Sequence, residues 1–138
     1  YKIRSSPHVC WSLKEREAQL KMKSLLLVAV GGVAGTLVRF GLSVVIPDDR
    51  TGTLAANLIG VALASVLLVL MERRGVTELR HLLLPGFCAG MTTFSAVTVQ
   101  VVEPISGGAL FLAQNIVLSL LIVLMVLPLS RKLIPVRK

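Results

Sequence analysis

The chain has 138 residues, of which 54% are hydrophobic and 16% charged, and its formal net charge is +8. Its mean hydropathy of +0.81 is too high for an ordinary soluble domain, which excludes a soluble enzyme as the main body of the protein. We therefore predict an all-α membrane protein, because backbone polar groups in lipid must pair within helices.

Residues 1–21 form a polar, basic head, and the stretch "MKSLLL" at Met22 has the character of a natural start. We expect the head to be an upstream extension or a misassigned start. A short amphipathic surface segment around Trp11 is the alternative. Residues 22–138 are predicted to form one transmembrane unit of four helices.

Four apolar runs follow the head, and Arg39 is the only charged residue within them. A bilayer core of roughly 30 Å requires about 20 mostly apolar residues for each spanning helix. The predicted spans are Ser24–Ile46, Thr53–Met71, Leu82–Val102 and Gly108–Leu129.

Small residues mark the faces on which the first two runs should pack. The first run carries Gly31 and Gly35, and the second carries Ala56, Gly60 and Ala64, each set spaced by four residues. Close backbone contact drives helix association in lipid, so both faces are predicted to be helix–helix interfaces.

Prolines and glycines indicate where the last two runs depart from a regular helix. Pro85, Gly86 and Gly90 predict a broken third helix, which is tolerated at membrane depth only where protein or a water-filled cavity surrounds it. Carbonyl groups freed near residues 89–93 could coordinate a small cation. Pro128 is expected to end the fourth helix.

Neutral hydrogen-bond donors lie at membrane depth in the last three runs. They include Asn57, Thr92, Thr93, Ser95, Gln114, Asn115 and Ser119. None of the runs contains Asp or Glu, which argues against a cation or proton path and favours an anion or a neutral solute. Arg39 is either an electropositive vestibule residue or an interfacial anchor. The Phe94 ring is either an anion contact through its positive edge or ordinary packing.

The basic residues are unevenly placed. Thirteen of them fall on the side that holds both termini and the loop between the second and third runs: Lys2, Arg4, Lys14, Arg16, Lys21, Lys23, Arg73, Arg74, Arg80, Arg131, Lys132, Arg137 and Lys138. The opposite side has only Arg50. By the positive-inside rule we expect both termini to be cytoplasmic in the cell membrane, and no nucleic-acid partner.

Three stretches resemble signature motifs of the Fluc (CrcB) fluoride channels. They are "GGVAGTLVRF" (31–40), "GTLAANLIG" (52–60) and "GFCAGMTTFS" (86–95), in the order and spacing of that family. The resemblance covers about residues 22–134. It implies an antiparallel dimer, a passive channel rather than an enzyme, and two fluoride paths along the subunit interface. It also implies a central structural sodium ion and no ATP or organic cofactor, with fluoride that enters cells as HF leaking out through the paths.

The resemblance also implies roles for individual residues. The carbonyls of Ala89 and Thr92 would bind Na⁺. The expected ion-pathway residues are Arg39, Asn57, Thr93, Phe94, Ser95 and Ser119.

The chain departs from the family pattern at four positions. Ala96 lacks a hydroxyl, Val97 lacks the second phenylalanine ring, Ala89 replaces a glycine, and Asn115 stands where the family often has tyrosine. A homodimer would therefore lack one ring in both paths. Together with the uneven basic residues, this leads us to expect one half of a heterodimer with an oppositely oriented paralogue.

Two other functions stay open at this stage. The loss of the second ring is also consistent with a non-conducting structural or regulatory subunit. A small four-helix multidrug transporter would need a carboxylate in its first span, and Ser24–Ile46 has none.

Overall fold

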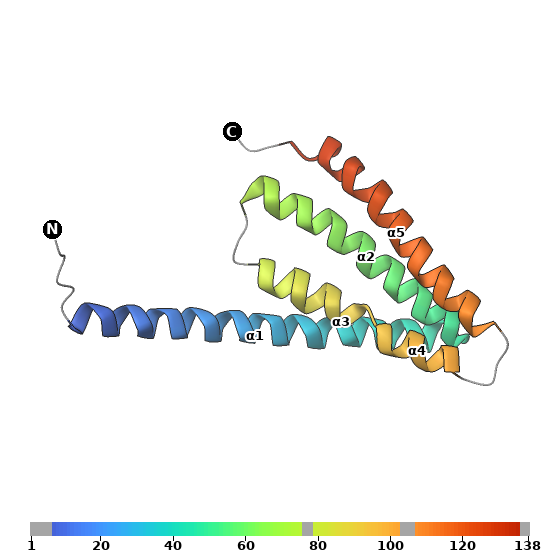
Figure 1. Ribbon diagram of the computed structural model, residues 1–138, viewed down its shortest axis with the longest axis horizontal. Helices are drawn as coiled ribbons and strands as arrows, with labels where there is room; N and C mark the ends of the chain where they lie inside the picture. The colour runs from blue at the N-terminus through green and yellow to red at the C-terminus, as the bar shows by residue number, and fades with distance from the viewer. Residues whose placement is uncertain (1–6, 76–78, 103–106, 136–138) are drawn as a thin grey trace.

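The computed structural model describes residues 7–75, 79–102 and 107–135. The elements in chain order are α1 (Pro7–Val45), α2 (Asp49–Arg74), the π-helix η1 (Leu82–Cys88), α3 (Ala89–Met91), α4 (Phe94–Val102) and α5 (Gly108–Leu133). Figure 1 labels the α-helices. Within these described residues the regular structure is helical, which confirms the predicted all-α class.

Four segments are long and apolar enough to cross a membrane. They are Glu15–Val45, Asp49–Arg74, Leu82–Val102 and Gly108–Leu133. The protein is therefore a multi-pass membrane protein, as its four apolar runs predicted. Helix α1 runs without interruption through Met22, and the separate origin of residues 1–21 stays a prediction.

Helix α2 is longer at both ends than the apolar run from which it was predicted. At its start the Asp48 carboxylate accepts a hydrogen bond from the Thr51 backbone N–H at 2.8 Å. At its end Gly75 adopts a φ of 66° and donates to the Met71 carbonyl at 3.0 Å. These caps satisfy backbone groups that the helix ends leave without partners, so polar turns extend the helix beyond its apolar centre.

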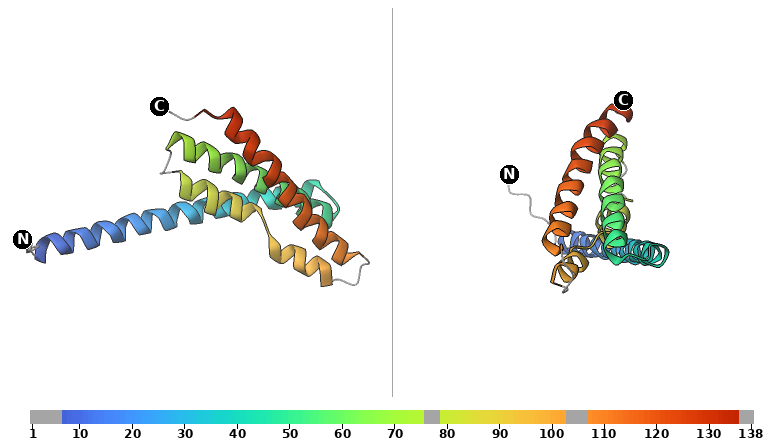
Figure 2. Two further views of the ribbon diagram at one scale, coloured as in Figure 1. Left: turned by 45° about the horizontal axis from the view of Figure 1, so that its top comes forward. Right: turned by 90° about the vertical axis from the view of Figure 1, so that its right-hand side faces the viewer.

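Helix α1 packs along η1 and α3, while α2 packs along α5, and the N-terminal part of α1 extends beyond the other helices (Figures 1 and 2). The glycines of the first predicted interface are where this packing is closest. A Cβ atom added to Gly31 would meet the Leu82 carbonyl oxygen, and one added to Gly35 would meet the Phe87 carbonyl oxygen. The partner of this glycine face is therefore the third span.

The small face of α2 also packs against the third span. Ala56 is fully buried, Gly60 is buried and Ala64 is half-buried. A Cβ atom added to Gly60 would lie 2.6 Å from Thr92 Cγ2. The third span thus lies between the glycine face of α1 and the small-residue face of α2.

Both intramembrane prolines lie inside helices. Pro85 is within η1, where its missing N–H removes the bond to the His81 carbonyl and the turns widen into a π-helix. Pro128 is within α5, which continues to Leu133, so the prediction that Pro128 ends the fourth helix is wrong. A proline removes one hydrogen bond, but in lipid the neighbouring backbone groups have no better partner than the helix itself.

Candidate functional site

The helical hydrogen bonding of the third span is interrupted at two threonines. Helix α3 ends at Met91, Thr92 is extended with φ −82° and ψ 148°, and α4 begins at Phe94. In a continuous α-helix the Thr93 N–H would donate to the Ala89 carbonyl four residues earlier. The interruption removes that bond.

Asn57 of α2 pairs with both backbone groups of Thr93. The Thr93 N–H donates to Asn57 Oδ1 at 2.7 Å, and Asn57 Nδ2 donates to the Thr93 carbonyl at 3.2 Å. A side chain from a neighbouring helix therefore replaces the bonds that the interruption removed, which is the condition for irregular backbone at membrane depth.

Thr93 also caps the helix that follows it. The Ala96 N–H, which would bond the Thr92 carbonyl in a continuous helix, instead donates to Thr93 Oγ1 at 3.3 Å. The carbonyls of Ala89 and Thr92 have thus both lost their helical donors. The Ala89 carbonyl lies 3.4 Å from Thr92 Oγ1, which is a long hydrogen bond.

Asn57 is in turn held by an amide on α5. Its Nδ2 donates to Asn115 Oδ1 at 3.0 Å, and Asn115 Nδ2 donates to the Phe111 carbonyl at 3.2 Å. The residues are 8% and 6% exposed, so these amides are removed from solvent and their hydrogen bonds matter for stability. Both N–H bonds of Asn57 Nδ2 are directed at protein oxygens.

Two pockets adjoin the interruption, and Thr93 lines both. The first has a volume of about 490 Å³. It is lined by Thr36, Arg39, Phe40, Ser43, Gly52, Thr53, Thr93, Ser95, Ala96, Val99 and Gln100. Arg39 is half-buried there, and the hydroxyls of Thr93 and Ser95 lie 3.1 Å apart.

The second pocket has a volume of about 230 Å³ and lies between α2, the interruption and α5. It is lined by Asn57, Val61, Thr92, Thr93, Phe94, Val97, Leu112, Asn115, Ile116 and Ser119. Phe94 is 69% exposed on the single chain, whereas Val97 is 1% exposed. The ring of Phe94 is thus largely uncovered by the chain's own side chains.

The predicted site residues are largely brought together. Arg39 and Ser95 line the first pocket, and Asn57, Thr92, Phe94 and Ser119 line the second, with Thr93 in both. Ala89 lines neither pocket and lies one helical turn before the interruption.

One buried amide at the other end of the first pocket was missed. Gln100 is 8% exposed, and its Nε2 donates to the Asp49 carbonyl at 3.2 Å and to Thr53 Oγ1 at 3.1 Å. The backbone carbonyl of Gln100 accepts from the Arg50 guanidinium at 3.1 Å. The signal was available, because Gln100 is the only amide side chain between Leu82 and Val102.

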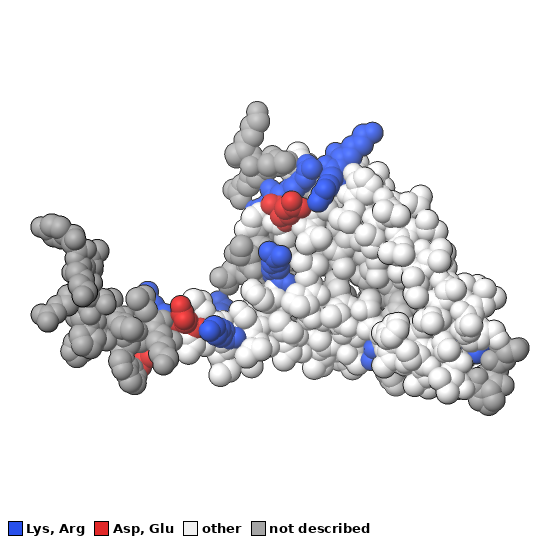
Figure 3. All heavy atoms as spheres, in the orientation of Figure 1, with Lys and Arg blue, Asp and Glu red and all other residues white. Residues whose placement is uncertain are grey.

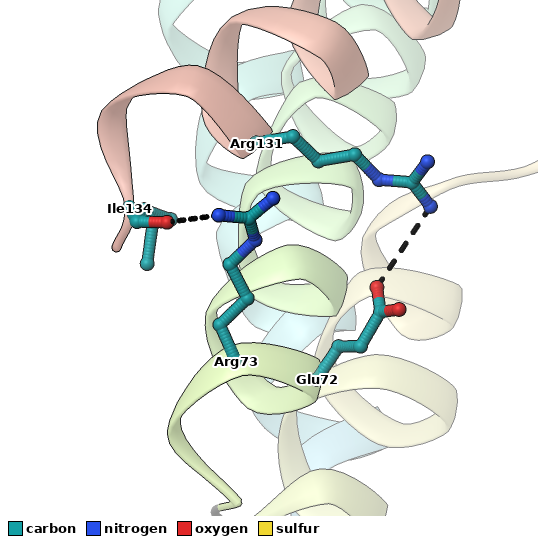
Figure 4. Close-up of polar contacts among 4 residues, drawn as sticks. All are labelled: Glu72, Arg73, Arg131 and Ile134. Atoms are coloured by element: carbon teal, nitrogen blue, oxygen red, sulfur yellow. Dashed lines mark hydrogen bonds and ion pairs between the residues drawn. The ribbon is translucent and has the colours of Figure 1, made fainter. Parts of the chain in front are cut away.

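The C-terminal ends of α2 and α5 form a basic surface. Figure 4 shows Arg73 donating to the Ile134 carbonyl at 2.7 Å and Arg131 pairing with Glu72 at 3.8 Å. The side chains of the ion pair are 58% and 61% exposed, so the pair contributes at most about 1 kcal/mol. Basic side chains gather at this end of the molecule (Figure 3).

Comparison with known proteins identifies the family. The family model described as CrcB-like protein, Camphor Resistance (CrcB), matches residues 26–130. A protein of Rhizobium etli named fluoride-specific ion channel FluC is 35% identical over 126 residues, which cover 82% of this chain and 100% of the relative.

Other relatives carry the same name. One from Rhizobium leguminosarum bv. trifolii is 36% identical over 125 residues, 81% of this chain and 99% of the relative. One from Chromobacterium violaceum is 37% identical over 94 residues, 64% of this chain and 75% of the relative. These relatives are named as ion channels and not as enzymes, and the resemblance seen in the three sequence motifs is confirmed. The chain belongs to the CrcB family.

Proposed function

We propose that this chain is a subunit of a fluoride-selective channel that lets fluoride leave the cell passively and so reduces its toxicity in the cytoplasm. The relatives' name, fluoride-specific ion channel, supports the ion. The observation that carries the proposal is the interruption at Thr92 and Thr93, where two pockets with hydroxyl and amide groups in largely apolar linings meet at membrane depth. The predicted spans contain no carboxylate that would repel an anion.

The two pockets provide the kinds of groups that an anion path needs. Arg39 in the first pocket would attract fluoride from water, and the hydroxyls of Thr93 and Ser95 would replace part of its hydration. In the second pocket the Phe94 ring edge and Ser119 would do the same. Neutral donors suit this task, because conduction needs binding strong enough for entry and weak enough for release.

The carbonyls expected to bind Na⁺ fit that role. Ala89 and Thr92 are the residues whose helical donors, the Thr93 and Ala96 N–H groups, bond side chains instead. Carbonyl oxygens without helical donors are suitable ligands for a hard monovalent cation. The ion would supply positive charge beside the anion path, and equivalent carbonyls of a second subunit would complete its ligand shell.

A second, antiparallel subunit would cover apolar surface that the chain leaves open. Leu37, Phe40 and Val44 of α1 are 64%, 66% and 68% exposed, and Phe94 is 69% exposed. Lipid and the second subunit would share this surface. We propose a paralogue rather than a second copy, because Val97 lacks a ring and the basic residues favour one orientation.

Fluoride efflux from liposomes tests the function. The chain would be reconstituted alone and together with a four-span paralogue of opposite Lys/Arg bias, and released fluoride would be measured with an electrode, with chloride as the control anion. We expect efflux from the pair and little from the chain alone. Robust efflux from the chain alone would refute the heterodimer, and no fluoride-selective efflux in either preparation would refute the channel.

The second candidate is a non-conducting subunit that only stabilises a channel partner, which the departures at Ala96 and Val97 favour. Phe94→Ile in the co-reconstituted pair separates the two functions. A pore-lining ring predicts a loss of efflux of about fivefold, since an aromatic contact is worth roughly 1 kcal/mol. Unchanged efflux in a stable complex would favour the supporting role. The multidrug transporter stays the less favoured alternative, because Ser24–Ile46 contains no carboxylate.

A further inference from the structure

Asn115 lies at the beginning of a chain of hydrogen bonds that ends at the interrupted backbone. The chain runs from the Phe111 carbonyl to Asn115, then to Asn57 and finally to Thr93. It links α5, α2 and the third span in the buried part of the molecule, where Asn57 and Asn115 are 8% and 6% exposed.

The direction of this chain is required at Thr93, whose carbonyl needs a donor and whose N–H needs an acceptor, and independently at its first member. The Phe111 carbonyl can only accept, so it requires the NH₂ group of Asn115 to face it. The Asn115 oxygen then faces Asn57 and requires a donor there, which turns the Asn57 NH₂ group toward α5. The Asn57 oxygen is left facing the Thr93 N–H, to which it bonds at 2.7 Å.

A reversed Asn57 amide would not fit this arrangement. Its NH₂ group would face the Thr93 N–H, and its oxygen would face both the Thr93 carbonyl and the Asn115 oxygen, so three hydrogen bonds would become repulsive contacts. The backbone groups of Thr93 and the oxygen of Asn115 therefore favour the same orientation of Asn57, and Asn115 reinforces that orientation although it makes no hydrogen bond to Thr93 in the structure.

We propose that Asn115 is a positioning residue that acts through Asn57 to hold the Thr93 N–H away from the Ala89 carbonyl, and so keeps the third span open at the interruption. The part of this proposal that concerns the interrupted backbone is argued from the hydrogen bonds of the chain alone. The consequence for fluoride flux rests on the proposed function.

Amide hydrogen exchange at Thr93 tests the proposal without any ion flux. The full chain would be labelled with ¹⁵N-threonine, and the exchange rate of the Thr93 amide would be compared in wild type, Asn115→Leu and the control Gln114→Leu. Leu is branched at Cγ as Asn is, although it is larger, and its side chain cannot form hydrogen bonds. Gln114 is the adjacent amide and is exposed, and the Thr98 amide within α4 is an internal reference.

Loss of the Asn115 amide is expected to speed Thr93 exchange about tenfold, the effect of weakening one buried hydrogen bond. Gln114→Leu should leave the rate unchanged. Asn57→Leu should speed exchange at least as much, and the double variant should exchange within about twofold of Asn57→Leu, because Asn115 acts only through Asn57. An unchanged rate in Asn115→Leu, or a double variant whose effects multiply, would overturn the proposal.

Asn115→Asp keeps the test decisive if the leucine variant does not fold. A protonated carboxyl group can donate to Phe111 and accept from Asn57, and an ionised one still accepts from Asn57. Protection at Thr93 should therefore stay within about twofold of wild type. Rapid exchange in a folded Asn115→Asp protein would contradict the proposal that Asn115 positions Asn57.

Flux measurements then separate this proposal from the function itself. In a conducting complex, Asn115→Leu should reduce fluoride efflux about tenfold together with the faster exchange. Reduced efflux with normal Thr93 protection would make Asn115 a direct ion contact and would overturn the proposal that it acts on Thr93 through Asn57. If no preparation conducts fluoride, the proposed function fails, while the exchange result still decides the role of Asn115.

Discussion

At the scale of the residue, Thr93 is the centre of the interruption. Its backbone N–H and carbonyl pair with Asn57, and its hydroxyl caps the Ala96 N–H. A short hydroxyl side chain is preferred at a helix N-cap because it reaches the N–H groups of the first turn. The hydroxyls that are unusual in an apolar span are thus placed where backbone groups need partners.

Thr93→Val removes the hydroxyl while keeping the volume of the side chain and both bonds to Asn57. We expect the free energy of unfolding to fall by about 1 kcal/mol, because the Ala96 N–H loses its cap. Unfolding of the purified protein in mixed micelles, titrated with SDS, would measure the change. In the control, Thr98→Val, the hydroxyl lost is one that bonds the Ser95 carbonyl of the same helix, and the change should stay within about 0.5 kcal/mol. Equal losses in the two variants would contradict the cap.

At the scale of the element, the glycines of α1 decide how closely the third span approaches. Added Cβ atoms at Gly31 and Gly35 would strike backbone atoms of η1, and backbone cannot move aside as a side-chain tip can. Gly32, the residue next to Gly31, has open space within 4 Å of such an atom. The glycines therefore differ in function although they look alike in the sequence.

Gly35→Ala should destabilise the protein by about 1–3 kcal/mol or more, the usual cost of overpacking. Gly32→Ala should be neutral or stabilising by up to about 1 kcal/mol, since alanine is the better helix former. Thermal unfolding in the same detergent compares the two variants. A Gly35→Ala protein as stable as Gly32→Ala would mean that α1 does not pack closely on the third span.

The N-terminus of α2 gives a prediction for pH. Hydrogen bonds from the Thr51 hydroxyl and backbone N–H, with Arg50 nearby, lower the pKa of Asp48 below its usual value of 3.8. A lowered folded-state pKa means that the ionised cap contributes stability above pH 3.8 and that this contribution disappears as pH falls through the folded pKa. Asn remains a good cap but does not titrate.

Unfolding of wild type and Asp48→Asn measured between pH 7 and pH 2 would check this. The stability difference between the two proteins should be constant near neutral pH and change only below pH 3.8. A difference that changes mainly between pH 5 and pH 7 would indicate that another group is responsible.

At the scale of the whole molecule, charge placement predicts one orientation. Basic residues occupy the last turns of α2 and α5, while Arg50 is the basic residue at the start of α2. Lys and Arg near span ends are retained in the cytoplasm during insertion. A single orientation also means that an antiparallel partner must be a different sequence.

Cysteine labelling in intact cells tests the orientation. In a background with Cys10 and Cys88 replaced by serine, a membrane-impermeant maleimide should label Asp48→Cys from outside, while Lys132→Cys should react only after the cells are opened. Equal labelling of both positions in intact cells would show two orientations and would remove the charge argument for a heterodimer.

Much of the architecture follows from the sequence, because the thickness of the bilayer determines the length of an apolar helix. The four spans and the all-α class were predicted on that basis, with ends that the caps at Asp48 and Gly75 moved outward. The family could also be identified, because three short motifs lie in order. The ions, the pathway roles and the second subunit remain proposals.

The sequence by itself determined where the membrane spans lie and which polar residues lie within them, since both depend on local composition. Only the tertiary structure decided which polar groups meet. Asn57 was expected to donate to an ion, but its N–H bonds are directed at Thr93 and Asn115, 36 and 58 residues away along the chain. No periodicity encodes such a pairing, because it depends on how α2, the interrupted span and α5 pack together.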